Sequence, residues 1–232
     1  MATKTDKDYQ KEHRKRLRER FLAGKLTDQE HMELLLSYAI PRIDVKPLAY
    51  TLLKKYGGVQ NVLVAPIEDL LKVSGVGPYS AGLLKLVNAV NIMNLKNTLT
   101  STPMFRDPKV LENYCKFSLA AKTVEEFHVL YLNSEFKLIL DNLHSIGTID
   151  WAAVHPREVV RRALDVNSRI MILVHNHPGG GDAFSTDDIK ITHAIQDAAI
   201  SFDSVILDHL LVVGNNVHSL KELRLLKEYK DD

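Results

Sequence analysis

Residues 170–188 read Ile170-Met-Ile-Leu-Val-His-Asn-His-Pro-Gly-Gly-Gly-Asp-Ala-Phe-Ser-Thr-Asp-Asp188 and form the most informative stretch of the chain. Its continuous apolar start is typical of a central strand that is buried on both faces. Pro178 cannot extend a strand ladder, and the three glycines after it allow the chain to fold back. Ser185 then stands three residues before Asp188, as in a helix-capping box. This stretch therefore predicts a buried strand, a tight loop and a helix.

The sequence on both sides extends this unit into an α/β domain. Residues 126–132 alternate apolar and polar side chains, and residues 137–140 are a further strand candidate. Residues 205–213 form another apolar run, which turns at Gly214. Pro156 occupies the first turn of a predicted helix. Strands that surround helices in this order indicate an α/β sandwich with a mixed sheet.

The first part of the chain has a helical period instead. Thr27 and Glu30 have the spacing of a capping box, and Pro66 begins another predicted helix. Residues 94–103 are rich in Asn, Thr and Ser and are interpreted as a linker. Asp107-Pro108 then resembles a cap and first helical turn. We therefore predict a basic, flexible tail at residues 1–20, an all-helical domain at 21–95 and an α/β domain at 104–232.

Composition limits the classes of protein to be considered. With 45% hydrophobic and 25% charged residues among 232, the chain has the composition of a globular protein, and a net charge of +1 excludes a uniformly basic surface. Its one cysteine, Cys115, cannot form an internal disulfide and is interpreted as a buried filler. We recognise no signal peptide and no apolar run of about 20 residues. We therefore expect a cytoplasmic protein without a membrane segment; the oligomeric state does not follow from the sequence.

His175 and His177 are the first two candidate metal ligands in this stretch. Residues i and i+2 of a strand point to the same face, so both imidazoles can face one point. Asp188, in the first turn of the next helix, can add an anionic ligand. Two histidines and a carboxylate suit Zn²⁺ and leave a fourth position for water, whose pKa the ion lowers to about 7. The sequence therefore predicts one zinc ion per chain.

Two simpler interpretations and one other metal stay open at this point. The histidines can merely end a strand, and Ser185 with Asp188 can form a capping box without any metal. Two histidines and a carboxylate also form the iron site of oxygenases. Because no redox partner is evident in the sequence, we prefer zinc. The joint pattern of His-x-His-Pro followed by Ser-x-x-Asp is more specific than either part alone.

This pattern resembles the JAMM motif of JAB/MPN-type metalloproteins, and the surrounding sequence is similar to their bacterial RadC-like branch. The similarity covers the second domain throughout. The segments that share the order and approximate spacing of that branch are Glu125-Glu126-Phe127-His128-Val129-Leu130, Gly147-Thr148-Ile149-Asp150, His155-Pro156-Arg157-Glu158-Val159, His175-Asn176-His177-Pro178 and Asp208-His209. The resemblance implies a JAB/MPN α/β sandwich and an association with DNA repair.

The resemblance also implies roles for individual residues. His175, His177 and Asp188 would bind zinc, and a glutamate just before Phe127 would be the catalytic acid/base. The family pattern of Glu, any residue and Phe selects Glu125 over Glu126 for that role. Ser185 would donate a hydrogen bond to the oxyanion or to water. His209 lies in a predicted strand and can either pack near the site or be a hydrogen-bonded core histidine; we prefer the second interpretation. Neither it nor His155 and Arg157 is given a catalytic role.

In the helical domain, residues 73–78 (Val-Ser-Gly-Val-Gly-Pro) resemble a helix-hairpin-helix motif. The backbone N–H groups of Gly75, Val76 and Gly77 can bind a DNA phosphate at the start of the following helix without reading sequence. An ordinary tight connection between helices needs the same glycines. Ser80 stands where many such hairpins carry a basic residue, although Lys72, Lys85 and the basic tail can compensate.

Three hypotheses for the function follow. The first is a JAMM-type zinc hydrolase of amide or isopeptide bonds, with a peptide substrate. The second is a metal-dependent nuclease that acts on branched or single-stranded DNA, which the hairpin and the basic tail motivate. The third is a non-catalytic scaffold, associated with DNA, in which the metal stabilises the loop.

Overall fold

In the first unit, the helix that begins at Asp28 starts at its predicted capping signal. The computed structural model describes residues 4–147 and 154–228, and the chain divides into two units, Met1–Val90 and Asn91–Asp232. The Thr27 N–H donates to Glu30 Oε2 (2.9 Å) and the Glu30 N–H donates to Thr27 Oγ1 (3.4 Å), which is the expected capping box. The helices that lie within this unit are α1 (Lys4–Leu22), α2 (Asp28–Ala39), α3 (Lys46–Tyr56), α4 (Val59–Val64) and α5 (Ile67–Leu71).

The segment predicted as a basic, flexible tail, residues 1–20, is helical from Lys4 onward. Arg14 donates from its guanidinium to the carbonyl oxygens of Ile40 (3.0 Å) and Ile43 (2.7 Å). Arg20 forms an ion pair with Glu30. These side chains, which look solvated in the sequence, therefore attach α1 to α2 and to the segment after it.

The predicted linker at residues 94–103 is also largely helical, because α6 (Pro78–Ser101) continues through Asn94 to Ser101. The hydroxyls that indicated a loop donate back to the helix: Thr98 Oγ1 to Asn94 O (3.1 Å) and Ser101 Oγ to Asn97 O (2.8 Å). A buried Leu99 gives this last part of α6 an apolar contact. The division between the units lies inside α6, earlier than the predicted boundary.

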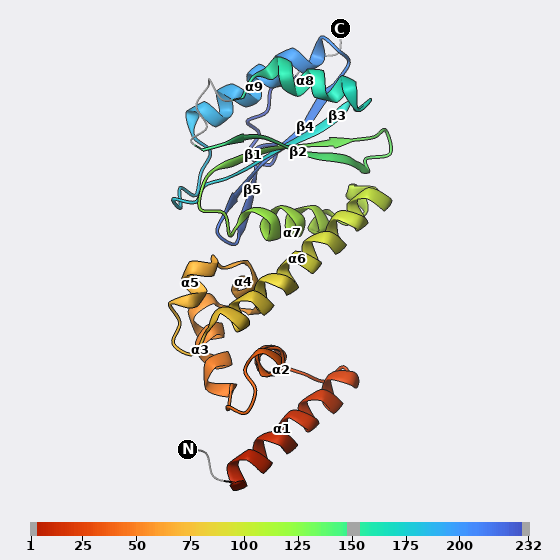
Figure 1. Ribbon diagram of the computed structural model, residues 1–232. Helices are drawn as coiled ribbons and strands as arrows, with labels where there is room; N and C mark the ends of the chain where they lie inside the picture. Colours follow the sequence, from red (N-terminus) through yellow and green to blue (C-terminus); the bar gives the residue numbers. More distant parts are fainter. Residues whose placement is uncertain (1–3, 148–153, 229–232) are drawn as a thin grey trace. The chain divides into compact units, whose positions relative to one another are not determined.

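The second unit contains a five-stranded mixed sheet of order β2-β1-β3-β4-β5 (Figure 1). β3 and β4 pair in parallel, and the other neighbouring strands pair antiparallel. The predicted fold class, helices followed by an α/β domain with a mixed sheet, is confirmed. The strands are β1 (Glu126–Leu132), β2 (Leu138–Ile146), β3 (Ile170–Asn176), β4 (Val205–Val213) and β5 (Asn216–Ser219).

Helices cover both faces of the sheet, which explains the continuous apolar run of β3. Figure 1 shows α8 (Pro156–Asp165) and α9 (Thr186–Ile200) on one face and α7 (Pro108–Leu119) on the other, after the short 3₁₀ helix η1 (Met104–Arg106). On the α8/α9 face, Leu173 packs in a cluster with Ile195. On the α7 face, Val174 packs in a cluster with Tyr114. A strand between two helical layers buries alternate side chains in two separate cores.

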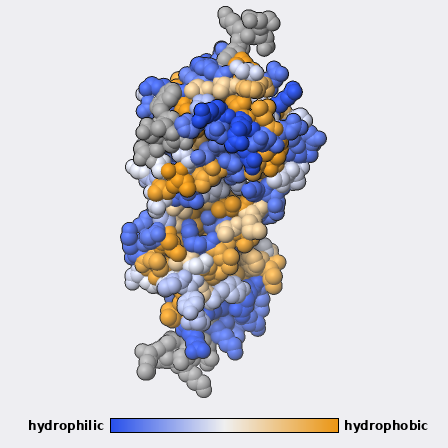
Figure 2. Space-filling view, turned by 45° about the horizontal axis from the view of Figure 1, so that its top comes forward, coloured by the Kyte–Doolittle hydropathy of each residue, from blue (hydrophilic) through white to orange (hydrophobic). Residues whose placement is uncertain are grey.

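The surface is mixed in character. Hydrophilic and hydrophobic side chains are interspersed over the face shown in Figure 2. Across residues 4–147 and 154–228, no helix combines the length and the apolar character needed to cross a membrane. Cys115 is buried, as predicted, and burial raises the pKa of its thiol far above the ordinary value. The cellular compartment stays a prediction.

A polar network lies between β1, β2 and α7. His128 lies 2.8 Å from Asp141 through Nδ1 and 3.1 Å from Glu126 through Nε2. Tyr114 donates from its hydroxyl to the second Asp141 oxygen (2.5 Å). Burial lowers the pKa of His128, but the bonds to Asp141 and Glu126 outweigh burial, so the net shift is upward. Burial raises the pKa of Asp141, and the His128 and Tyr114 contacts reverse that shift.

We expect Asp141→Asn to destabilise the second unit most strongly between about pH 5 and pH 6.5. Asp141 has a lowered pKa, so its contribution is present above the ordinary carboxyl range and is lost as the pH falls. His128 has a raised pKa, so its contribution is full below about pH 6.5 and is lost as the pH rises through the raised value. Urea unfolding of both proteins across this range checks the expectation, and a difference independent of pH contradicts it.

Candidate metal centre

The strand, loop and helix predicted from residues 170–188 hold the three candidate ligands. His175 is the penultimate residue of β3, and His177 follows the end of that strand. After Pro178 the chain turns back through Gly180, whose φ of 83° is in the left-handed region that favours glycine. Asp188 then lies in the first turn of α9. The local sequence therefore places ligands from two elements beside each other.

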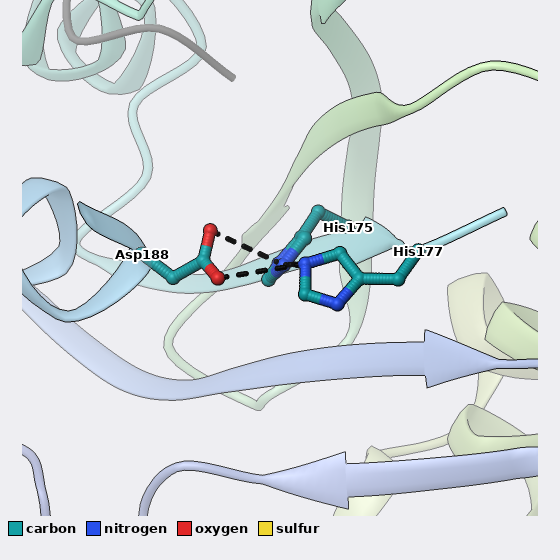
Figure 3. A group of neighbouring side chains, drawn as sticks. All are labelled: His175, His177 and Asp188. Carbon is teal, nitrogen blue, oxygen red and sulfur yellow. Dashed lines mark hydrogen bonds and ion pairs between the residues drawn. The ribbon is translucent and has the colours of Figure 1, made fainter. Parts of the chain in front are cut away.

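Figure 3 shows the carboxylate of Asp188 directed at both imidazole rings. His175 Nε2 and His177 Nε2 are 3.1 Å apart, and they lie 3.3 and 3.5 Å from the two carboxylate oxygens of Asp188. Zinc binds nitrogen and oxygen at about 2.0–2.1 Å, so neighbouring ligands of a tetrahedral site are about 3.3 Å apart. These three residues form a group that can hold a metal ion. The separations of 3.1–3.5 Å are close to that value, and each histidine lies next to a different oxygen of Asp188.

Hydrogen bonds on the outer side of the site fix how His177 presents its ring. His177 Nδ1 lies 2.9 Å from Gly181 O. A carbonyl oxygen can only accept, so Nδ1 carries the proton and the Nε2 lone pair faces the other two ligands. A histidine held in this way is in the form that binds a metal through Nε2.

Ser185 holds the carboxylate of Asp188. Its N–H and its hydroxyl both donate to Asp188 Oδ2 (2.7 Å each), and the Asp188 N–H donates to Ser185 Oγ (3.1 Å). Burial raises the pKa of Asp188, but the interactions with His175 and Ser185 outweigh it and hold that pKa well below its ordinary value. The third ligand is therefore anionic. The hydroxyl proton of Ser185 is used here, and its donor role toward a substrate stays a prediction.

The Glu126 side chain lies on the face of the sheet opposite the metal group, where it pairs with Lys122 and His128. Its carboxylate lies 2.9 Å from Lys122 Nζ and 3.1 Å from His128 Nε2. Burial raises the pKa of Glu126, and the contacts with Lys122 and His128 reverse the shift, so the net pKa is lowered. A carboxylate held ionised by two partners and directed toward α7 is poorly suited to exchange protons at the metal site.

The backbone around Glu125 lies next to the two histidines. β1 and β3 pair antiparallel as far as Phe127 and His175, whose ring centroids are 6.4 Å apart. Glu125 immediately precedes β1, and the Gly147 N–H donates to Glu125 O (2.8 Å). The role of the Glu125 side chain at the metal site stays a prediction.

Two residues outside the predicted site contact this region. The Asn176 side chain, which has no role predicted from the sequence, accepts from the Glu126 N–H (2.8 Å) and donates to Val124 O (3.1 Å), so it holds the backbone on both sides of Glu125. His209 is a buried, hydrogen-bonded histidine and also lies near the site, because one of its partners is His175, at 2.8 Å.

His155 and Arg157, from another segment quoted for the family resemblance, are not among the three candidate ligands. His155 is an exposed residue at the start of α8, and Arg157 lies 3.6 Å from the neighbouring Glu158. Thr148, Ile149 and Asp150 lie outside the described residues.

The segment 73–78 does join two helices, α5 and α6, through a turn in which Gly75 has a φ of 94°. The Val76 N–H donates to Val73 O (3.0 Å), and the Gly77 N–H donates to Ser80 Oγ (3.0 Å). Two of the three N–H groups predicted to bind phosphate are therefore already used.

Lys85 and Lys72, the two lysines expected to replace the missing basic residue of the hairpin, also have partners within the protein. Lys85 donates to the carbonyl oxygens of Leu63 (2.8 Å) and Ala65 (2.6 Å), and burial lowers its pKa. Lys72 forms an ion pair with Asp69 at 2.7 Å. These contacts stabilise the helical unit. DNA binding by Gly75, Val76 and Gly77 stays a prediction.

A mixed sheet between helical layers, with a His-x-His pair after a central strand and an aspartate on the next helix, defines an α/β domain of the JAB type with a candidate metal site. Residues 105–225 match a family model described as RadC-like JAB domain. The chain is also 40% identical over 212 residues to a UPF0758 protein of Ruegeria pomeroyi, a match that covers 90% of this chain and 94% of that protein. The chain belongs to the RadC-like JAB domain family.

We expect the purified protein to bind one zinc ion per chain and Asp188→Asn to weaken zinc binding by more than about 100-fold, because the neutral amide removes the only anionic ligand. Elemental analysis after dialysis and titration calorimetry measure both quantities. His218→Ala is the matched control, since that partly exposed histidine pairs with Asp182 and is not one of the three ligands. Equal zinc binding by Asp188→Asn and the parent protein contradicts the assignment.

Proposed function

We propose that this chain is a zinc-dependent hydrolase of amide or isopeptide bonds, with Glu125 as its catalytic acid/base. The observation that supports the proposal is the spacing of His175 Nε2, His177 Nε2 and the Asp188 carboxylate oxygens, 3.1–3.5 Å, which is close to the separation of neighbouring ligands in a tetrahedral zinc site. Membership of the RadC-like JAB domain family supports the same chemistry.

In this proposal His175, His177 and Asp188 would hold the metal, which would supply Lewis acidity and lower the pKa of a water molecule to about 7. Glu125 would accept a proton from the attacking water and return it to the leaving amine when the carbon–nitrogen bond of the substrate breaks. The Asn176 side chain fixes the backbone on both sides of Glu125 and so contributes to its orientation.

The number of metal groups favours amides over phosphodiesters. Enzymes that cleave phosphodiesters commonly use two metal ions about 3.5–4 Å apart. Over the part of the chain that the structure describes, His175, His177 and Asp188 make up the one group of three side chains able to share an ion. The internal hydrogen bonds of Gly77 and Lys85 also give a DNA substrate less support.

We expect Glu125→Gln to lower hydrolysis of an amide or isopeptide substrate by at least about 100-fold while zinc content is unchanged, because the amide cannot accept the proton. The measurement is turnover by zinc-loaded protein on a panel of peptides and isopeptide-linked peptides, with branched and single-stranded DNA in parallel.

Glu126→Gln is the matched control for this experiment. It changes the neighbouring residue in the same way, and its carboxylate is directed at Lys122 and His128. It should keep the activity and lower stability only. Activity on DNA alone would replace the amide proposal with a nuclease, zinc binding without any turnover would favour a scaffold, and full activity of Glu125→Gln would refute the choice of acid/base.

A further inference from the structure

A hydrogen-bonded chain of buried side chains runs from the back of His175 to the helix that carries Asp188. His175 Nδ1 lies 2.8 Å from His209 Nε2, and His209 Nδ1 lies 2.6 Å from Thr192 Oγ1. Thr192 Oγ1 in turn lies 2.6 Å from Asp188 O. His175, His209 and Thr192 are each 0% exposed. The chain therefore connects β3, β4 and α9 without access to water.

The last hydrogen bond of this series, from Thr192 to Asp188 O, determines which atom donates in each of the others. Asp188 O is a carbonyl oxygen and can only accept, so the single hydroxyl proton of Thr192 is donated to it. Thr192 Oγ1 must then accept from His209, which puts the proton of His209 on Nδ1. His209 Nε2 is left as an acceptor and receives the Nδ1 proton of His175. With both imidazoles neutral, any other order places two lone pairs against each other at 2.6–2.8 Å.

We propose that Thr192 and His209 are positioning residues that hold His175 in the form with its proton on Nδ1, so that Nε2 is available for the metal. This inference rests on the proposed zinc site. The series of hydrogen bonds ends at the backbone of Asp188. It therefore also connects two candidate ligands, His175 on β3 and Asp188 on α9, through His209 on β4. Neither residue is one of the three candidate ligands: His209 contacts the back of the His175 ring, and Thr192 contacts the backbone of Asp188.

The surroundings of His209 protect this order. The rings of Phe127 and Phe184 lie against it, with centroids 5.6 and 5.2 Å away. These rings exclude water, which could otherwise take the place of either partner and allow the imidazole of His175 to rotate. A buried polar group that loses a hydrogen-bond partner finds no water to replace it, and leaving the group unpaired costs free energy. The ring orientation and proton position of His175 should therefore depend on the Thr192 hydroxyl, which is two hydrogen bonds away.

The test compares zinc affinity of the full chain with those of Thr192→Val and Thr192→Ser, by competition with a chromophoric chelator at one pH. Valine keeps the shape and removes the acceptor, so we expect affinity to fall about 10–100-fold, the usual effect of losing such an outer partner. Serine keeps the hydroxyl and should stay within about threefold of the parent protein. Unfolding midpoints report whether each variant is folded.

A second measurement does not depend on the variants. In zinc-loaded parent protein, NMR should detect nitrogen–nitrogen coupling across the hydrogen bond from His175 Nδ1 to His209 Nε2, with the proton on His175. A proton on His209 Nε2 overturns the proposal, as does unchanged affinity in folded Thr192→Val. In the second case the zinc site stands and only the positioning role falls. A parent protein that binds no zinc instead removes the proposed function, and this role with it.

Discussion

Two imidazole nitrogens and a carboxylate face one another at 3.1–3.5 Å in a mostly buried corner between β3 and α9. Lone pairs at such distances repel unless a cation lies between them, and burial strengthens the repulsion because the local dielectric constant is low. The rest of the second unit maintains this arrangement. Gly181 O holds one ring, His209 holds the other, and Ser185 holds the carboxylate.

The position of β3 in the sheet makes this corner rigid. β3 pairs with β1 on one side and β4 on the other, and its alternate side chains enter separate cores beneath α7 and beneath α8 and α9. Its end therefore cannot shift without disturbing both cores. The adjacent residues His175 and Asn176 consequently have different roles. His175 is one of the three candidate ligands, and the Asn176 side chain forms hydrogen bonds with the backbone on both sides of Glu125.

Local chemistry made much of this predictable from sequence. His175, His177 and Asp188 could be identified because strand alternation and a capping box fix their directions within a few residues. The strand at 205–213 could be read from its apolar run. His209 and Asn176 could not be assigned, since their partners lie 34 and about 50 residues away in the chain. The helical structure of residues 4–22 and 94–101 could not be predicted locally, because long-range contacts of Arg14 and burial of Leu99 favour helix there.

The central claim is that one divalent ion is shared by three side chains from β3, the loop after it and α9. Anomalous diffraction at the zinc absorption edge, from crystals grown without added metal, tests it most directly. The account predicts a single peak per chain within about 2.0–2.2 Å of His175 Nε2, His177 Nε2 and an Asp188 oxygen. An absent peak, or one away from these atoms, would contradict it.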